Sequence, residues 1–471
     1  MQLHRAGQDV DFKKVAANPF PVRLFHQMTS STYLHRVVNL MRPDGNHLLN
    51  QSYEQAVELV ASGEPAQVAK IQGQFAIAAT SGRIVRMARS IGRTMRYFLA
   101  KKVDGPCLFI AERMEELREA LDKEGLSDQF HPSYTRTVPA HYVVQIELVG
   151  CPDPNPRYDR FFTPERNALP SDIEWIGQKY IGQLSNACDQ WLDRIPKTAG
   201  IGVLFSGGID SGAVLLAIYD RLLKRGESPA RLKAFTLQVD GVAEDAAQAH
   251  QFVRKMQLEM LWETIECTAS DLDWRHAVWV VEDYKPLDIQ SATMAIAVCQ
   301  GIRKRYPDWK YLVDGDGGDE NLKDYPIEDN PELTIRSVLN NLMLYQEGWG
   351  VHAIKHSLVH SGGQSRGHVR TSAPAIACGF SGFSPFALPQ VIEVAESIPF
   401  IDLTQWDHAK LYALKGEVVR SGIKSVTGFD MPVFQKRRFQ HGAINKQRFA
   451  ELFPSDEAEY RQAFLDRWAT V

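Results

Sequence analysis

Hydrophobic and polar positions follow two different patterns along the chain. In the N-terminal part the apolar runs are short. Residues 74–89 form two apolar segments around Ser81-Gly82, which is typical of a β-hairpin, and the β-branched residues of 140–148 predict another strand. Residues 113–125 have helical spacing and end in a glycine, so they predict a short helix. We therefore expect a β-rich region before about residue 160.

The pattern changes after residue 172, where apolar residues at helical spacing predict a long amphipathic helix. Apolar strand-like runs and amphipathic helical runs then alternate. The expected strands are 201–205, 232–239 and 309–315, and the expected helices are 172–195, 212–226, 244–257 and about 291–304. This order is typical of an α/β fold with a parallel, doubly wound sheet. From residue 330 onward the pattern is mostly helical.

Two polar stretches suggest connections between these regions. Residues 150–172 are rich in proline and polar residues and are the best candidate for a linker. We accordingly expect a first domain over 1–160 and a second over 161–471. The glycine- and serine-containing stretch 360–374 predicts a mobile loop, and we expect a solvated surface connection there rather than a lid.

Composition narrows the class of protein. The hydrophobic fraction is 44%, the charged fraction is 23% and the net charge is −4, which argues against a general nucleic-acid or membrane surface. No apolar run approaches the roughly 18 residues that a membrane helix needs. The six cysteines form no CxxC pair, and the N-terminus shows no apolar leader. We therefore expect a cytoplasmic protein that binds neither nucleic acid nor membrane.

The stretch SGGIDS, residues 206–211, lies between an expected strand and an expected helix. Backbone N–H groups and the positive end of the helix dipole would converge there on an anion. Gly207 and Gly208 let the backbone approach phosphate oxygens, and Ser206 and Ser211 can donate hydroxyl hydrogen bonds. Asp210 would repel a bare phosphate, but it suits a Mg²⁺ ion between them. The loop matches neither GxxxxGK[ST] nor GxGxxG.

A second loop repeats this design after the expected strand near residue 312. Within a few glycine-rich residues it places four acids, Asp314, Asp316, Asp319 and Glu320, which would repel one another unless cations neutralise them. The carboxyl ends of parallel strands meet at one edge of a sheet, so we expect both loops to lie at the same edge.

These two loops resemble those of a known family. SGGxDS is similar to the PP-loop of the N-type ATP pyrophosphatases, and DGDGGDE at 314–320 resembles the sGxGgDE motif of asparagine synthetase-type synthetase domains. The resemblance implies that Asp210 and Asp319 bind Mg²⁺ and that the backbone of Gly315 meets the nucleotide. Asp316 falls where asparagine synthetases have a catalytic glutamate and β-lactam synthetases have a tyrosine.

Further family motifs follow in the same order. Residues 234–240 resemble the family's second strand, which implies that Leu237, together with Leu204 of the first strand, helps to hold the adenine. Residues 384–399 resemble the SPFLDxxLxxxAxxIP helix. Residues 432–442 resemble RQKxxFxxG, whose lysine falls on Lys436 and is implied to contact phosphates and stabilise the developing charge.

The first domain resembles a class II glutamine amidotransferase domain of the Ntn type, through residues 73–98 and 139–148. Its chemistry is missing. The chain begins Met1-Gln2, the first cysteine is Cys107, Gln72 replaces a substrate-binding aspartate, and Arg-Asp has become Arg89-Ser90. The resemblance therefore implies a degenerate domain without glutaminase activity.

Together these features predict an ATP-dependent amide-forming ligase that uses Mg²⁺. It would adenylate a small-molecule or peptide carboxylate, release pyrophosphate and pass the acyl group to ammonia or an amine, and we expect a role in natural-product biosynthesis. Ammonia-dependent asparagine synthesis and lasso-peptide-type macrolactam formation stay open. A tRNA-modifying enzyme or a non-catalytic nucleotide-binding protein fits less well. A homodimer is possible, and the sequence leaves the acyl substrate open.

Overall fold

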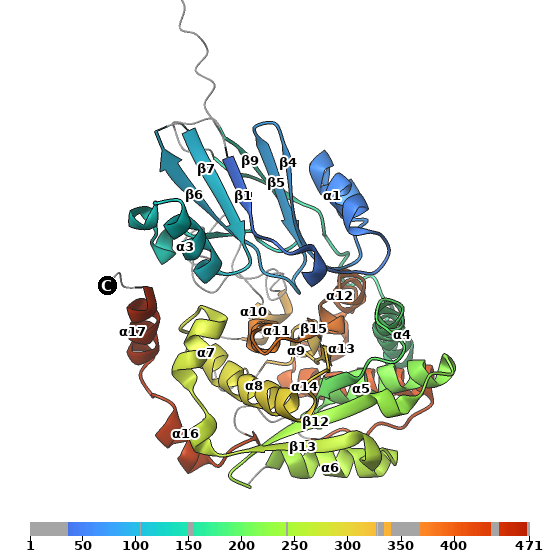
Figure 1. Cartoon of the computed structure of the whole chain (residues 1–471). Helices are drawn as coiled ribbons and strands as arrows, with labels where there is room; N and C mark the ends of the chain where they lie inside the picture. The colour runs from blue at the N-terminus through green and yellow to red at the C-terminus, as the bar shows by residue number, and fades with distance from the viewer. Residues whose placement is uncertain are drawn as a thin grey trace, which may run out of the picture.

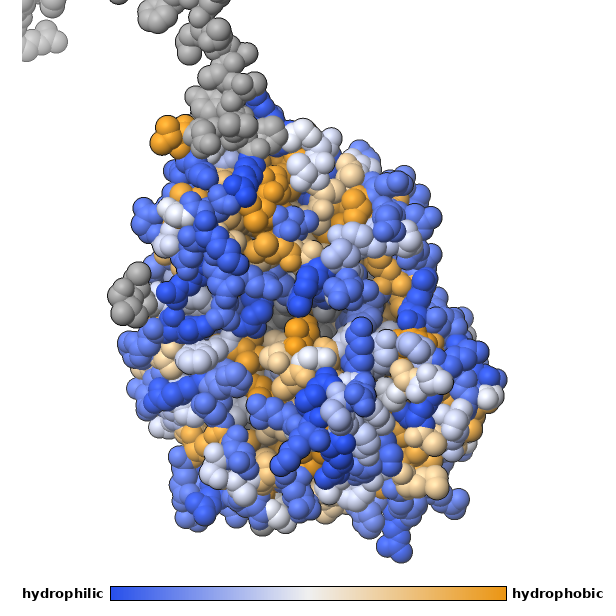
Figure 2. Space-filling view, viewed as in Figure 1, coloured by the Kyte–Doolittle hydropathy of each residue, from blue (hydrophilic) through white to orange (hydrophobic). Residues whose placement is uncertain are grey.

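The computed structural model describes residues 36–103, 105–148, 155–241, 244–325, 327, 334–340, 368–434 and 442–468. Figure 1 shows an N-terminal part built from strands above a C-terminal part in which helices surround a second group of strands. Hydrophilic residues cover most of the face seen there (Figure 2). Within the described ranges, every helix is too short or too polar to cross a lipid bilayer.

The N-terminal part consists of two stacked four-stranded sheets. Strands run in the orders β1-β7-β6-β8 and β10-β9-β5-β4. Their bounds are β1 Arg36–Asn39, β4 Ala76–Ser81, β5 Ile84–Arg89, β6 Arg96–Lys102, β7 Gly105–Ala111, β8 Arg136–Thr137, β9 Tyr142–Glu147 and β10 Arg157–Arg160. A short pair, β2 His47–Leu48 and β3 Gly73–Gln74, lies beside them. The predicted hairpin is confirmed as β4 and β5, and the strand predicted at 140–148 is β9.

Three apolar layers hold this part together. Side chains such as Val85 and Leu108 fill the space between the two sheets. The outer face of one sheet packs against α1 (Tyr53–Ser62) and α2 (Pro65–Val68) through residues that include Val60 and Ile77. The outer face of the other packs against α3 (Met114–Lys123) through Phe109 and Leu117. The layer order is helix, sheet, sheet, helix (Figure 1).

The C-terminal part is built on a five-stranded parallel sheet in the order β13-β12-β11-β14-β15. The strands are β11 Ile201–Leu204, β12 Leu232–Val239, β13 Trp262–Cys267, β14 Tyr311–Val313 and β15 Ser381–Phe383. Helices α4 (Ile173–Leu192), α5 (Ile209–Lys224) and α6 (Glu244–Met256) pack on one face, where Val203 and Ala234 point. Helices α7 (Trp274–Val281) and α8 (Pro286–Arg305) cover Phe235 and Leu237 on the other. The predicted α/β fold with a doubly wound parallel sheet is observed.

The remaining helices follow the fourth strand, as the pattern predicted. They are α9 Gly318–Asn321, α10 Ile335–Asn340, α11 His368–Ala377, α12 Pro389–Glu396, α13 Phe400–Thr404, α14 His408–Thr427, α16 Lys446–Leu452 and α17 Glu457–Trp468. Strand β15 interrupts them and extends the sheet beside β14. Helix α14 lies against α4 and carries Leu411, Leu414 and Val418 into the same core as α5.

Four boundaries differ from the sequence prediction. The predicted linker contains β10. Its polar composition does not suggest a strand, but its backbone pairs with that of β9 in an antiparallel ladder. Helix α5 begins at Ile209 rather than near Gly212, with Gly208 at its N-cap. Helix α8 begins at Pro286, because proline suits the first helical position, and not at 291. The stretch predicted as a surface loop is helical from His368 onward, since α11 packs against α8; its residues 360–367 lie outside the described ranges.

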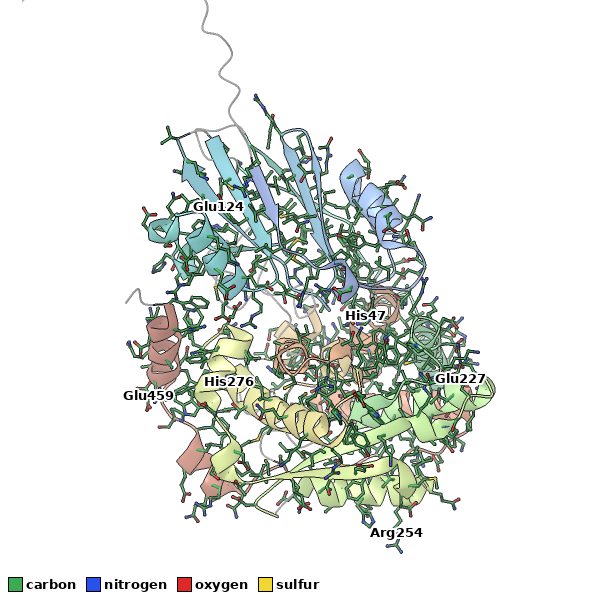
Figure 3. The ribbon with its side chains drawn as sticks, viewed as in Figure 1. His47, Glu124, Glu227, Arg254, His276 and Glu459 are labelled. Atoms are coloured by element: carbon green, nitrogen blue, oxygen red, sulfur yellow. The ribbon has the colours of Figure 1, made fainter. Side chains whose placement is uncertain are left out.

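The two parts contact each other through buried side chains. His47 of β2 lies at their junction (Figure 3), where its Nε2 is 3.0 Å from the Ser381 hydroxyl of β15. Burial, reinforced by the charges of Arg93 and Lys310, lowers the pKa of His47 to about 4, so its ring is neutral at pH 7. Ile91 also packs against Ile392. The N-terminal part therefore packs directly against the C-terminal part.

Candidate active site

The two glycine-rich loops lie at the point where the sheet order reverses. From β11 the chain proceeds to β12 and β13 on one side, whereas β14 and β15 lie on the other. The loop that carries Ser206–Ser211 follows β11, and the loop that carries Asp314–Glu320 follows β14. These strands are parallel neighbours, so both loops leave the same edge between them. Ligands of open α/β sheets bind in this position.

The first loop is tightly curled around its two serines. The Ser206 hydroxyl accepts a hydrogen bond from the backbone N–H of Gly208 and lies 3.3 Å from the Ser211 hydroxyl. Gly207 has a φ of 74°, and a Cβ there would lie 2.6 Å from the backbone nitrogen of Ala249 on α6. Only glycine fits this combination of left-handed backbone and close approach.

The second loop packs directly against the first. A Cβ on Gly315 would lie 2.8 Å from the backbone nitrogen of Ser211, and one on Gly318 would lie 2.2 Å from the Asp210 Oδ1. Gly317 between them has a φ of 98°. The glycines of the acidic loop thus allow its backbone to reach the start of α5. This contact brings Asp210 and Asp319 into one site.

Asp314 and Asp316 form a buried carboxyl pair behind this contact. Asp314 accepts hydrogen bonds from the backbone N–H of Asp316 and from the Ser384 hydroxyl, both at 3.0 Å. Burial raises the pKa of Asp314 to about 7, against the effect of these two donors. Burial and the charge of Asp314 raise the pKa of Asp316 well above its usual range. At neutral pH the pair therefore retains protons that ordinary aspartates would release.

Lys415 of α14 joins the two loops, and the sequence reasoning missed it. Its Nζ lies 2.6 Å from the Asp210 Oδ2, contacts the Asp319 Oδ1 and lies 3.3 Å from the Asp324 Oδ2. The side chain is only 2% exposed. Burial opposes its charge, but the three aspartates raise the pKa of Lys415 well above its usual range, so it stays an ammonium ion.

A sequence signal for Lys415 exists. The lysine stands on the apolar stripe of its helix, four residues after Leu411 and three before Val418. A charge on a buried helix face needs a partner of opposite charge. The position of the lysine on the apolar stripe, rather than the composition of the helix, therefore indicates a buried ion pair. The helix is held close to α4, where a Cβ on Gly422 would lie 2.2 Å from the carbonyl oxygen of Gly177.

Arg370 of α11 interacts electrostatically with Asp316. Its Nε donates to the Asp288 Oδ1 at 2.8 Å, and the neighbouring Thr371 side chain hydrogen-bonds to Asp316. The charges of Asp288, Glu320 and Asp316 raise the pKa of Arg370. The expectation of a solvated surface connection over 360–374 is therefore wrong at Arg370, whose guanidinium group pairs with Asp288.

The predicted adenine-binding residues lie on neighbouring strands. Leu204 ends β11 and pairs with Phe235, so Leu237 lies two residues farther along β12 toward the same edge. Both contribute to the apolar cluster on the α7 and α8 face of the sheet. Lys436 lies outside the described residues, and its role stays a prediction. Beyond that gap, Ala443 accepts a hydrogen bond from the N–H of Val239 at the end of β12.

The donor set suits a magnesium ion that arrives with other ligands. Asp210 and Asp319 offer hard carboxylate oxygens that converge on the Lys415 ammonium group. In the described ranges, no three or more His, Cys, Asp or Glu side chains are grouped to hold a metal. Mg²⁺ commonly takes one or two carboxylates together with water and phosphate oxygens, so this pair fits it.

Comparison with known proteins finds a family match within the C-terminal part. The family model for asparagine synthase matches residues 193–366, a range that contains both loops. The search of curated proteins found no match. A match to this family implies an ATP-dependent ligase of the amide-forming kind. Residues 193–366 are therefore similar to an asparagine synthetase-type domain.

Proposed function

We propose that the protein adenylates a substrate carboxylate with ATP, releases pyrophosphate and transfers the acyl group to ammonia or an amine. The observation that carries this proposal is the convergence of Asp210 and Asp319, from the loops after β11 and β14, on one buried point. Two carboxylates beside a glycine-rich helix start are what a magnesium–triphosphate complex requires.

The first loop supplies the contacts for the phosphates. The backbone N–H groups at the start of α5 and the hydroxyls of Ser206 and Ser211 would donate to phosphate oxygens, while Leu204 and Leu237 would support the adenine. Bound Mg²⁺ would neutralise charge on the polyphosphate, held by Asp210 and Asp319. Lys436 would add a positive charge to the leaving pyrophosphate.

Asp316 is the candidate base for the attacking amine. A carboxylate of ordinary pKa is a poor acceptor for the proton of an ammonium ion. A raised carboxyl pKa lies closer to the pKa of the ammonium ion, so the proton transfer becomes less unfavourable. The buried position of Asp316 behind Asp314 gives it such a pKa. A cationic amine that enters the pocket would favour loss of the Asp316 proton to water, because the resulting carboxylate and the ammonium ion form a charge pair.

The N-terminal part supports ammonia or an amine as nucleophile, rather than glutamine. Cys107 is completely buried within β7, where it packs as a core residue. The guanidinium group of Arg89 is buried and donates to the carbonyl oxygens of Val138, Ser90 and Arg93. The Ser90 hydroxyl accepts a hydrogen bond from the N–H of Phe75. These side chains make structural contacts, which supports the proposal of a degenerate amidotransferase-like domain.

Pyrophosphate release tests the proposal. The full chain would be incubated with ATP, Mg²⁺ and panels of carboxylic acids, with ammonium or amines as the second substrate. We expect release that depends on one acid class and an amide product that depends on one nucleophile. Asp210→Asn should abolish release, and the exposed Asp193→Asn should not. Release that is independent of every acid, or glutamine-dependent release equal to that with ammonium, would overturn the proposal.

A further inference from the structure

We propose that Lys415 is a positioning residue that takes the place of the metal ion in the nucleotide-free protein. It holds the Asp210 and Asp319 carboxylates together and competes with Mg²⁺ for them, so that the metal enters only with the triphosphate. This inference rests on the proposed nucleotide site. The position of Lys415 follows from the contacts of α14.

The geometry makes the ammonium group a third element of the site. Its Nζ is within hydrogen-bond distance of one oxygen from each carboxylate, and these carboxylates come from loops that follow different strands. Asp210 is 20% exposed and Asp319 is 40% exposed, whereas Lys415 is 2% exposed. The cation therefore approaches the two carboxylates from the protein interior, and part of each aspartate side chain is accessible to solvent.

The charge around the lysine explains why a metal alone would bind weakly. The Lys415 ammonium group places a positive charge next to the Asp210, Asp319 and Asp324 carboxylates. A divalent ion that enters without nucleotide must share oxygens with this ammonium group, and like charges a few ångströms apart repel. Mg²⁺ also gives up its water ligands reluctantly, which disfavours its binding to carboxylates without phosphate oxygens.

A triphosphate changes both conditions. It brings phosphate oxygens that complete the coordination shell and negative charge that offsets the repulsion between ammonium group and metal. Asp324, which is 9% exposed and 3.3 Å from the Nζ, can retain the lysine when the metal takes over Asp210 and Asp319. The backbone N–H of Asp324 donates to the carbonyl oxygen of Asp319, so both acids move with one loop.

Binding of Mn²⁺, the paramagnetic substitute for Mg²⁺, tests this inference without turnover. Electron paramagnetic resonance would measure free Mn²⁺ in titrations of the full chain, with and without a non-hydrolysable ATP analogue. We expect wild type to bind Mn²⁺ far more tightly with the analogue than without it. Lys415→Met should bind Mn²⁺ alone at least about tenfold more tightly than wild type, because the competing charge is gone.

Controls separate this result from a loss of structure. Lys424→Met removes an exposed lysine from the same helix and should leave Mn²⁺ binding unchanged. Lys415→Arg keeps the charge and should behave like wild type without nucleotide. If Lys415→Met does not fold, the arginine variant and wild type still decide the question.

Equal Mn²⁺ affinity of wild type with the analogue bound and without it would overturn the proposal. A folded Lys415→Met variant with no gain in affinity would do so as well. Failure of wild type to bind the analogue would instead refute the proposed function, and the comparison with Mn²⁺ alone would still stand.

Discussion

Arg96 of the N-terminal part and Glu282 of the C-terminal part form a buried ion pair, with 3.3 Å between the Nε and the Oε2. Both side chains are 3% exposed. The Glu282 carboxylate also accepts hydrogen bonds from the backbone N–H groups of Met114 and Glu115, at the start of α3. Glu282 directly follows α7, so one side chain connects the N-terminal sheets to the segment that leads into α8 and Asp288.

Glu282→Gln should destabilise the protein by about 3 kcal/mol, because it leaves the buried Arg96 guanidinium group without its counter-charge. Chemical denaturation with urea would measure the loss. Glu124→Gln is the matched control. Glu124 (Figure 3) pairs with Arg36, which is 57% exposed, and such pairs contribute less than about 1 kcal/mol. Equal losses of unfolding free energy in the two variants would show that the buried Glu282 pair contributes no more to stability than an exposed one.

Gly207→Ala should disrupt the first loop and abolish binding of ATP. The new methyl group would meet the backbone of Ala249 at 2.6–2.7 Å, and α6 would have to move. Gly226→Ala is the control, because its φ of 66° is similar but its Cβ would meet no described atom within 4 Å. It should cost about 1 kcal/mol of stability and leave ATP binding intact. Calorimetric titration with ATP and urea denaturation would distinguish the variants, and a Gly207→Ala protein with normal affinity would contradict the loop's role.

The sequence predicts the sheet and the two loops well because both depend on local patterns. Apolar runs of strand length at 201–205 and 232–239 correspond to β11 and β12, and the rule for parallel sheets then places the loops at one edge. The order of motifs is also local information. The same reasoning locates Asp210 and Asp319 on those loops, without a distance between them.

Contacts between distant segments are what the sequence does not reveal. Lys415 is 205 residues from Asp210 and 96 from Asp319, so the sequence around the lysine does not indicate which acids it contacts. Arg370 lies in a stretch whose glycines and serines predict a loop, but packing against α8 makes its end helical. In both cases tertiary contacts outweigh local composition.

Gly422→Ala should destabilise the crossing of α14 and α4. Its Cβ would lie 2.2 Å from the carbonyl oxygen of Gly177 and 2.4 Å from the Ile181 side chain, and overpacking of this kind costs about 1–3 kcal/mol. Gly182→Ala in α4 is the control, since its Cβ would meet no described atom within 4 Å. It should stabilise the protein by about 0.5–1 kcal/mol through helix propensity. Urea denaturation of both variants measures this contrast, and a neutral Gly422→Ala variant would show that α14 can shift freely away from α4.

The pH dependence of stability should reveal Asp283, the residue after Glu282. Burial raises the pKa of Asp283 to about 6, with Lys285 opposing the shift and Asp288 reinforcing it. The folded protein therefore binds a proton that the unfolded chain releases between about pH 4 and pH 6, and this contribution to stability falls as the pH rises through that range. Asp283→Asn removes the ionised form and can still accept the hydrogen bond from the N–H of Tyr284. It should be more stable than wild type by about 3 kcal/mol above pH 6, with a gain that shrinks toward zero below pH 4.

Asp430→Asn should show the opposite sign and a small effect, because Arg420 lowers the pKa of this exposed carboxyl group. Urea denaturation of the three proteins from pH 4 to pH 8 gives the two difference curves. A gain for Asp283→Asn that does not change with pH would mean that Asp283 is ionised normally in the folded protein.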